Sequence, residues 1–184
     1  MGALLDVFFA AIIAALLMVN VADTNDDLLT MQHRNTLQYA LQSNSSQLQL
    51  ILLRDLRMAG YGAGTQTGVI RADSTSLELR GDFLRDGGTH IVRYSLDAPG
   101  SATTTPHALD RLLWRSLDDR RPEAFAFGLI DLRFAALDSA GQSTADSSLV
   151  RQVRYEYALE STVPLSDRPP ALYVSGAMTP KNLR

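Results

Sequence analysis

The sequence contains no cysteine, which excludes a disulfide framework, a thiolate metal site and a cysteine nucleophile. Basic residues are also scarce at the start, because no Lys or Arg precedes Arg34, and no dense basic cluster follows. With a formal net charge of −3, the chain shows no pattern typical of nucleic-acid binding. Hydrophobic residues make up 46% and charged residues 20% of the 184 positions, which is the composition of a globular domain.

Glycine and proline are both missing between Gly2 and Gly60, so an uninterrupted helix is permitted over that stretch. Within it, residues 3–22 contain only two polar members, Asp6 and Asn20. A helix of about twenty residues crosses a hydrocarbon core of ~30 Å. Because no basic residue precedes this run, we expect a retained single-pass membrane segment instead of a cleaved signal peptide, while a leader already removed is equally compatible with the missing basic residues.

After residue 22 the stretch becomes amphipathic. Leucines recur close to one face of a helix, with polar residues between them, at Leu37, Leu41, Leu48, Leu52 and Leu56. Arg54 and Arg57 suit the C-terminal end of the helix dipole, and Gly60 can adopt the left-handed conformation that ends a helix. We therefore predict a helical stem over residues 1–59, made of a membrane or filament-core segment (3–22) and an amphipathic half (23–59).

Past Gly64 the pattern changes to short runs in which apolar and polar residues mostly alternate, as in half-buried antiparallel strands. These runs cover residues 69–71, 77–80, 91–96, 129–134 and 150–157. Turn residues at 81–88 and 138–148 predict two hairpins, and residues 109–117 fit either a strand or a short helix. Residues 60–184 are therefore predicted to form a β-rich head. The fold class is α+β, with the amphipathic half of the long N-terminal helix packed on a mainly antiparallel sheet.

Two acidic clusters have features of calcium sites. Residues 23–27 begin with the oxygen spacing of an EF-hand loop, but the sixth position is Leu28 instead of glycine and the twelfth is Arg34 instead of glutamate. A solvated helix face at the membrane boundary is the better interpretation. Asp82 and Asp86 precede two glycines and could hold calcium in a turn, yet acids and glycines are also ordinary in hairpin loops. We predict no metal and no cofactor.

Candidates for catalysis are few. His33, His90 and His107 lie on different predicted elements, share no metal-ligand spacing and are expected to be surface histidines. The chain has no G-x-S-x-G motif, and its glycine-rich segment 60–68 follows a helix, whereas a dinucleotide-binding loop follows a strand. Trp114 is expected in the core. We therefore predict that this protein is not an enzyme.

Several stretches, taken in order and spacing, resemble one family. They are "RDLRMAGYG" at the end of the stem, "SLELRGDFLRDGGTHIVRYSL", "ALDRLLWR", "FGLIDLRFAALDSAG" followed by "LVRQVRYEYALES", and the terminal "MTPKNLR". Together with the N-terminal apolar helix, they resemble type IV pilins, and within these the minor pilins and type II secretion pseudopilins of the J-like and W-like class. Each stretch is weak alone, but together they cover most of the chain.

The resemblance implies a structural subunit of a type IV pilus-like or type II secretion pseudopilus filament. It implies that Asp6 pairs with the terminal amine of a neighbouring subunit. It also implies that other stems pack against Phe8, Phe9, Ile12, Ile13, Leu16 and Leu17, and that a candidate processing site lies at Met1, Gly2 and Ala3. The expected partners are other pilin-like subunits or copies of this chain, together with the assembly machinery. The expected location is the inner membrane before assembly, and a periplasmic pseudopilus or extracellular pilus afterwards.

Other functions stay open at this point. The chain could be the main repeating subunit of an unusual filament instead of a minor, tip-located or initiating one. It could also be a single-pass membrane protein whose head binds a ligand or a partner domain without polymerising. A tethered hydrolase that depends on His90 or His107 is a weaker third alternative.

Overall fold

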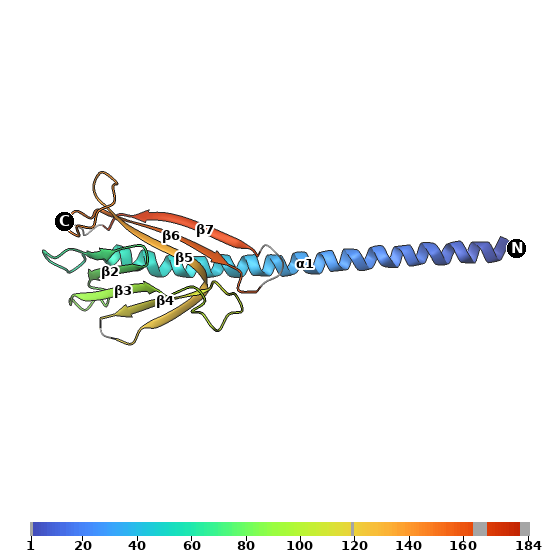
Figure 1. Cartoon of the computed structure of the whole chain (residues 1–184), viewed down its shortest axis with the longest axis horizontal. Coiled ribbons are helices and arrows are strands. Elements are labelled where there is room, and N and C mark those ends of the chain that lie inside the picture. Colours follow the sequence, from blue (N-terminus) through green and yellow to red (C-terminus); the bar gives the residue numbers. More distant parts are fainter. Residues whose placement is uncertain (1, 119, 164–168, 181–184) are drawn as a thin grey trace. The chain divides into compact units, whose positions relative to one another are not determined.

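The computed structural model describes residues 2–118, 120–163 and 169–180 (Figure 1). Its elements are the helix α1 (Gly2–Met58) and the strands β1 (Val69–Ala72), β2 (Ser76–Gly81), β3 (His90–Leu96), β4 (Arg111–Leu117), β5 (Glu123–Leu137), β6 (Gln152–Glu160) and β7 (Ala171–Met178). The prediction of one long N-terminal helix followed by an antiparallel sheet is confirmed. The chain divides into two compact units at a boundary inside α1, Met1–Gln38 and Tyr39–Arg184.

Helix α1 ends where the sequence predicts. The amide of Tyr61 donates to the carbonyl of Met58 at 3.0 Å, and Gly60 between them has a φ of 79°. Glycine adopts this left-handed conformation without a steric penalty, which is why it commonly follows the last helical turn. Gly81 lies directly against this turn, because a Cβ at Gly81 would collide with the Met58 carbonyl oxygen.

The seven strands form one antiparallel sheet in the order β1-β2-β3-β4-β5-β6-β7, so each strand pairs with its neighbours in sequence. Four of the five predicted runs lie within strands, and the fifth (150–157) begins two residues before β6. Residues 111–117 of the stretch 109–117 form β4, and the two predicted hairpins connect β2 to β3 and β5 to β6. The sequence pattern does not predict β7, because alanine, serine and glycine dilute its alternation. It also misses the start of β5, because Gly128 (φ 75°) and a register shift between Leu129 and Asp131 interrupt the pattern.

A single buried cluster contains residues from α1 and from the sheet. From α1 it includes Leu41, Leu48, Leu52 and Leu56, and from the sheet it includes Leu79, Val92, Leu113, Leu132, Phe134 and Leu159. Hydrogen bonds also join these elements. The hydroxyls of Ser45 and Tyr157 lie 2.7 Å apart, and the side-chain amide of Asn44 donates to the carbonyl of Phe127 at 3.1 Å. The leucine period in the sequence thus identifies the buried side of residues 39–58.

A buried ionic network connects α1 to β3 and β4. Asp55 is 1% exposed, and its Oδ2 accepts hydrogen bonds from the Tyr94 hydroxyl (2.6 Å) and from Arg115 Nε (2.7 Å). Burial raises the pKa of Tyr94, and the charge of Asp55 raises it further. Burial acts to lower the pKa of Arg115, but the hydrogen bond and charge of Asp55 outweigh it and the net shift is upward. Tyr94 therefore keeps its proton and Arg115 its charge, so both continue to donate to Asp55.

Candidate functional site

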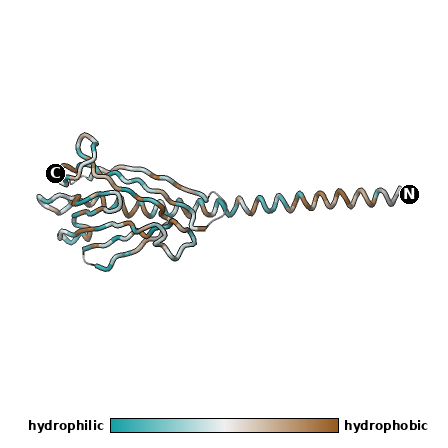
Figure 2. The backbone as a smooth tube through the Cα atoms, in the orientation of Figure 1, coloured by the Kyte–Doolittle hydropathy of each residue, from teal (hydrophilic) through white to brown (hydrophobic). Residues whose placement is uncertain are grey.

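The N-terminal part of α1 is rich in hydrophobic residues, whose positions are brown along the backbone tube in Figure 2, and their side chains are exposed. The six apolar side chains expected to contact other stems are 40–61% exposed, and they are Phe8, Phe9, Ile12, Ile13, Leu16 and Leu17. They form two adjacent ridges at four-residue spacing, the geometry that interlocks when two helices pack together. The helix is long and apolar enough to cross a membrane, with an 18-residue window of mean hydropathy 2.1. These properties fit a membrane anchor.

Asp6 lies near the start of this surface, in the second turn of α1, and its side chain is exposed. Phe9, three residues later, shares its face of the helix. No ion pair involves Asp6 within the described part of the chain. Of the candidate processing residues, Met1 lies outside the described residues, and Gly2 is the first residue of α1. An acid in an apolar helix is expensive to place in hydrocarbon, so Asp6 marks either an interface or a pairing position.

The polar residues beyond the apolar ridges bond back to their own helix. The side-chain amide of Asn20 donates to the carbonyl of Leu16 at 3.1 Å, and the hydroxyl of Thr24 donates to the carbonyl of Asn20 at 2.7 Å. Residues 23–27 are helical and exposed. The EF-hand alternative is therefore wrong, because a calcium-binding loop cannot form within a continuous helix. The preferred interpretation as an exposed helix face is confirmed.

A second cluster lies at the β2–β3 hairpin and is centred on His90. His90 Nδ1 is 2.7 Å from Asp118 Oδ2 at the end of β4, and His90 Nε2 is 3.0 Å from Asp86 Oδ1 in the hairpin turn. The hydrogen bond with Asp86, followed by that with Asp118, raises the pKa of His90, and the same bond lowers the pKa of Asp86. Burial acts to raise the pKa of Asp118, but the amide of Ile91 and the His90 ring outweigh it and lower that pKa. His90 therefore links the turn of the β2–β3 hairpin to the residue that follows β4.

Asp82 lies close to these ion pairs. Asp82, Asp86 and His90 each have one potential metal-binding atom, and these three atoms lie within 4.8 Å of one another. Both Asp82 oxygens are already acceptors, however, from the amides of Asp86 (3.1 Å) and Gly87 (3.0 Å). Asp82 is 4% exposed and serves as the cap of the turn. His90 is thus a third potential ligand at the calcium site considered for Asp82 and Asp86. The contacts present are, however, the hydrogen bonds and ion pairs of a hairpin turn.

Two expectations about aromatic and histidine side chains are wrong. The side chains of His90 and His107 are 16% and 13% exposed, so neither is a surface histidine, whereas His33 is exposed on α1. Trp114 is only half-buried and lies outside the hydrophobic core, where its Nε1 donates to Asp97 Oδ2 at 2.6 Å. Side chains alternate along a strand, so the neighbour of an inward Leu113 must point outward.

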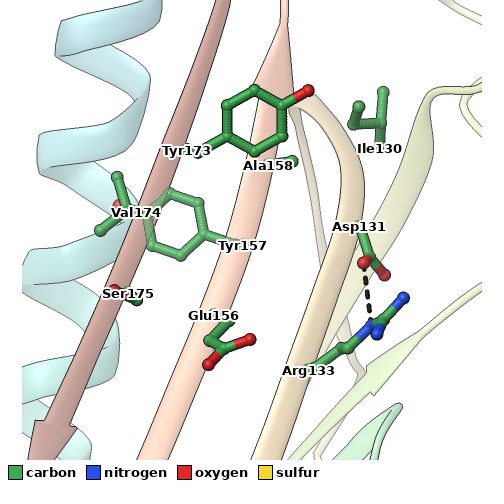
Figure 3. A pocket seen from close by; sticks show the side chains of 9 residues that line it. All are labelled: Ile130, Asp131, Arg133, Glu156, Tyr157, Ala158, Tyr173, Val174 and Ser175. Carbon is green, nitrogen blue, oxygen red and sulfur yellow. Dashed lines mark ion pairs between the residues drawn. The ribbon is translucent and has the colours of Figure 1, made fainter.

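The sheet also carries a shallow groove of about 460 Å³ on its side formed by β5, β6 and β7 (Figure 3). Tyr173, 74% exposed, and Ile130 supply apolar surface. Asp131, Arg133 and Glu156 supply charge, with Arg133 Nε 2.9 Å from Asp131 Oδ2. No residue of this groove was singled out from the sequence, because β5, β6 and β7 bring its lining together only in the folded sheet.

No protein-family model matches the chain, and no curated protein matches it. Function is therefore inferred from the residues themselves. The exposed apolar ridges and Asp6 form the surface that most needs a partner, since large contiguous apolar patches on a protein mark contacts with other proteins or with membrane.

Proposed function

We propose that this protein is a structural subunit of a type IV pilus-like or type II secretion pseudopilus filament, acting as a minor pilin or pseudopilin. The observation that supports this most is the apolar N-terminal part of α1, whose two ridges are exposed while the later leucines of the same helix are buried in the head. A pilin-like stem packed on an antiparallel sheet needs both properties. The resemblance of the sequence to J-like and W-like members adds the family assignment to this proposal.

In the proposed mechanism, the apolar part of α1 holds the subunit in the inner membrane and then packs against other stems while the heads pack outside. Lipid tails are as apolar as the stem, so leaving the bilayer gains little hydrophobic free energy, and close helix packing supplies most of the attraction. Asp6 adds to this balance, because a carboxylate in hydrocarbon is unfavourable, by about 2.5–3.5 kcal/mol at the centre of a membrane helix and by less near its end, where Asp6 lies. Pairing Asp6 with the terminal amine of a neighbour would remove that cost. Repetition of this head-to-tail contact generates an open helical filament.

The second candidate function is a membrane-anchored binding domain that does not polymerise. The groove on β5, β6 and β7 favours it, because Tyr173 and the neighbouring charges offer both apolar contact and polar recognition. Both candidates use α1 as an anchor. They differ in whether Asp6 contacts another subunit.

Substitution of Asp6 separates the two. Asp6→Ala should abolish incorporation into filaments while leaving the protein in the membrane fraction, and Asp6→Glu should retain incorporation. Asp23→Ala is the matched control, since Asp23 is an exposed acid of the same helix outside the apolar segment. The measurement is electron microscopy of filaments sheared from the native cells, with peptide mass spectrometry of the fibre. Equal incorporation of Asp6→Ala and the wild type would contradict the proposal.

The composition of the same fibres shows whether this chain is a minor or the main subunit. A trace of this chain among other pilins supports the minor role, and a dominant amount makes it the main repeating subunit. If filaments form without the chain, which stays in the membrane, the anchored binding domain becomes the better account. The N-terminal peptide also shows whether processing occurs at Met1, Gly2 or Ala3.

A further inference from the structure

His107 lies between two carboxylates at the end of the sheet where β4 begins and β6 ends. His107 Nε2 is 2.9 Å from Glu160 Oε2, and His107 Nδ1 is 3.5 Å from Asp110 Oδ1. The amide of Leu109 donates to His107 Nδ1 at 3.2 Å. Nδ1 therefore accepts, and the ring proton resides on Nε2, where it is donated to Glu160. This contact fixes both the tautomer and the orientation of the ring.

Asp110 has no corresponding donor. Its side chain is 1% exposed, and neither carboxylate oxygen accepts a hydrogen bond from any group in the described part of the chain. Its 3.5 Å contact with His107 Nδ1 joins two acceptors, because that nitrogen carries a lone pair. Two lone pairs that face each other in a buried place repel unless a positive charge lies between them.

We propose that Asp110 and His107 form a binding site for a divalent transition-metal ion of the zinc class. Zinc binds histidine nitrogen at about 2.0–2.1 Å and carboxylate oxygen at about 2.0–2.2 Å, so two ligands of a tetrahedral ion stand roughly 3.3 Å apart. The observed 3.5 Å between Nδ1 and Oδ1 matches this spacing. Imidazole selects zinc-class ions over calcium and magnesium, which bind oxygen ligands.

Glu160 completes the arrangement without contacting the ion. Metal-binding histidines commonly donate their second ring N–H to a carboxylate, which orients the ring and strengthens the ligand. Glu160 accepts that proton from His107 Nε2, on the side of the ring away from Asp110. An ion on Nδ1 would displace the amide of Leu109, whose residue is 53% exposed, so water can replace that hydrogen bond. Water would fill the remaining coordination positions, so we expect modest affinity.

The ion would join two residues of the loop between β3 and β4, and the contact between His107 and Glu160 links this loop to the end of β6. Asp110 already anchors this loop through its backbone, because its amide donates to the carbonyl of His107 and its carbonyl accepts from the amide of Ala102, both at 3.3 Å. Neither ligand belongs to the apolar surface of α1. The metal site and the filament proposal can therefore fail independently.

The test is isothermal titration of ZnCl₂ into the full-length, metal-stripped protein in detergent micelles. We expect one Zn²⁺ per chain, at least tenfold weaker binding in His107→Gln and in Asp110→Asn, and about tenfold weaker binding in Glu160→Gln. His90→Gln is the matched control, because it removes a histidine from the other His–Asp cluster, and it should bind like the wild type. Addition of Mg²⁺ in excess should not compete.

Three results would overturn the proposal: no Zn²⁺ binding by the wild type up to millimolar concentration, equal binding by His107→Gln, or loss of the binding step in His90→Gln. The last result would place the ion at the β2–β3 hairpin. Fluorescence of Trp114 and far-UV circular dichroism check that each variant is folded. If Asp110→Asn does not fold, His107→Gln and Glu160→Gln still decide the question, because both side chains are more accessible than Asp110.

Discussion

Replacing Arg115 with methionine is expected to destabilise the protein strongly, although methionine keeps most of the side-chain volume. Arg115 Nε donates to Asp55 Oδ2 at 2.7 Å, and the two side chains are 13% and 1% exposed. Without the guanidinium, the buried Asp55 carboxylate keeps the Tyr94 hydroxyl at 2.6 Å and the mostly exposed Arg54, whose Nε lies 3.7 Å from Asp55 Oδ1. Removing one partner of a buried ion pair costs about 3–5 kcal/mol, because the remaining charge is poorly compensated, and the exposed, more distant Arg54 compensates Asp55 only weakly.

A second variant separates the cost of the unpaired charge from the cost of the changed side-chain volume. In a triple variant, Asp55→Leu, Tyr94→Phe and Arg115→Met, no polar group of the network is left unpaired. Its stability should lie within about 2 kcal/mol of the wild type, since well-packed apolar residues often replace buried ion pairs at little cost. Arg133→Met is the matched control, because Arg133 pairs with Asp131 at 2.9 Å on the exposed side of the sheet. Its loss should cost less than about 1 kcal/mol.

The assay is urea unfolding of the full-length protein in detergent micelles, followed by the fluorescence of Trp114, the only tryptophan. Midpoints and slopes give the free energy of unfolding for each variant. If Arg115→Met loses no more stability than Arg133→Met, water must reach Asp55, and the buried ion pair does not stabilise the fold as argued above. If the triple variant is as unstable as Arg115→Met, volume and packing explain the loss instead of charge.

Three further predictions use the same unfolding assay. The pKa of His90 is raised in the folded state above the unfolded value of about 6.5. The ion pairs of protonated His90 with Asp86 and Asp118 therefore stabilise the fold fully below about pH 6.5, and this stabilisation is lost as the pH rises through the folded pKa. In His90→Gln, the urea midpoint should therefore change less with pH between the unfolded and the folded pKa of His90 than it does in the wild type. Leu52→Ala removes a fully buried side chain and should cost about 2–5 kcal/mol, against less than about 0.5 for Leu50→Ala, which is 71% exposed. Gly128 and Gly141 both have positive φ, so replacement by alanine should cost about 1–2 kcal/mol at Gly141. Gly128→Ala should cost more, because the new Cβ would also collide with the carbonyl oxygen of Glu160 in β6.

The sequence predicts the elements with strong periodicity and misses those without it. The leucine period locates Leu48, Leu52 and Leu56 in the core, and Gly60 locates the end of α1. The runs that become β2, β3 and β6 alternate clearly, because one side of each strand contributes to the buried cluster. Strand β7 lies at the edge of the sheet and buries neither side fully, so selection for apolar residues at alternate positions is weak there.

The polar clusters could not be predicted in the same way. His90 contacts Asp118, 28 positions away, and His107 contacts Glu160, 53 positions away, only because antiparallel pairing brings strand ends together. The pairing of Asp55 with Arg115 spans 60 residues and needs α1 to lie against a particular pair of strands. Sequence spacing reveals sites whose ligands share one element, such as an EF-hand loop, but a cluster built from several strand ends leaves no local signature.

The two parts of α1 differ in how their apolar residues are distributed around the helix. From Leu41 onward the buried leucines occupy one side of the helix, and the other side is mostly polar and exposed to water, with Leu50 as an exposed exception. Between residues 7 and 21 almost every position is apolar, and a helix that is apolar all round is stable only in lipid or among other helices. The polar residues 23–27 separate these parts. Introducing lysine at Ile13 should therefore reduce membrane and filament association while leaving the urea midpoint of the head unchanged, because Ile13 is 58% exposed and lies outside the core.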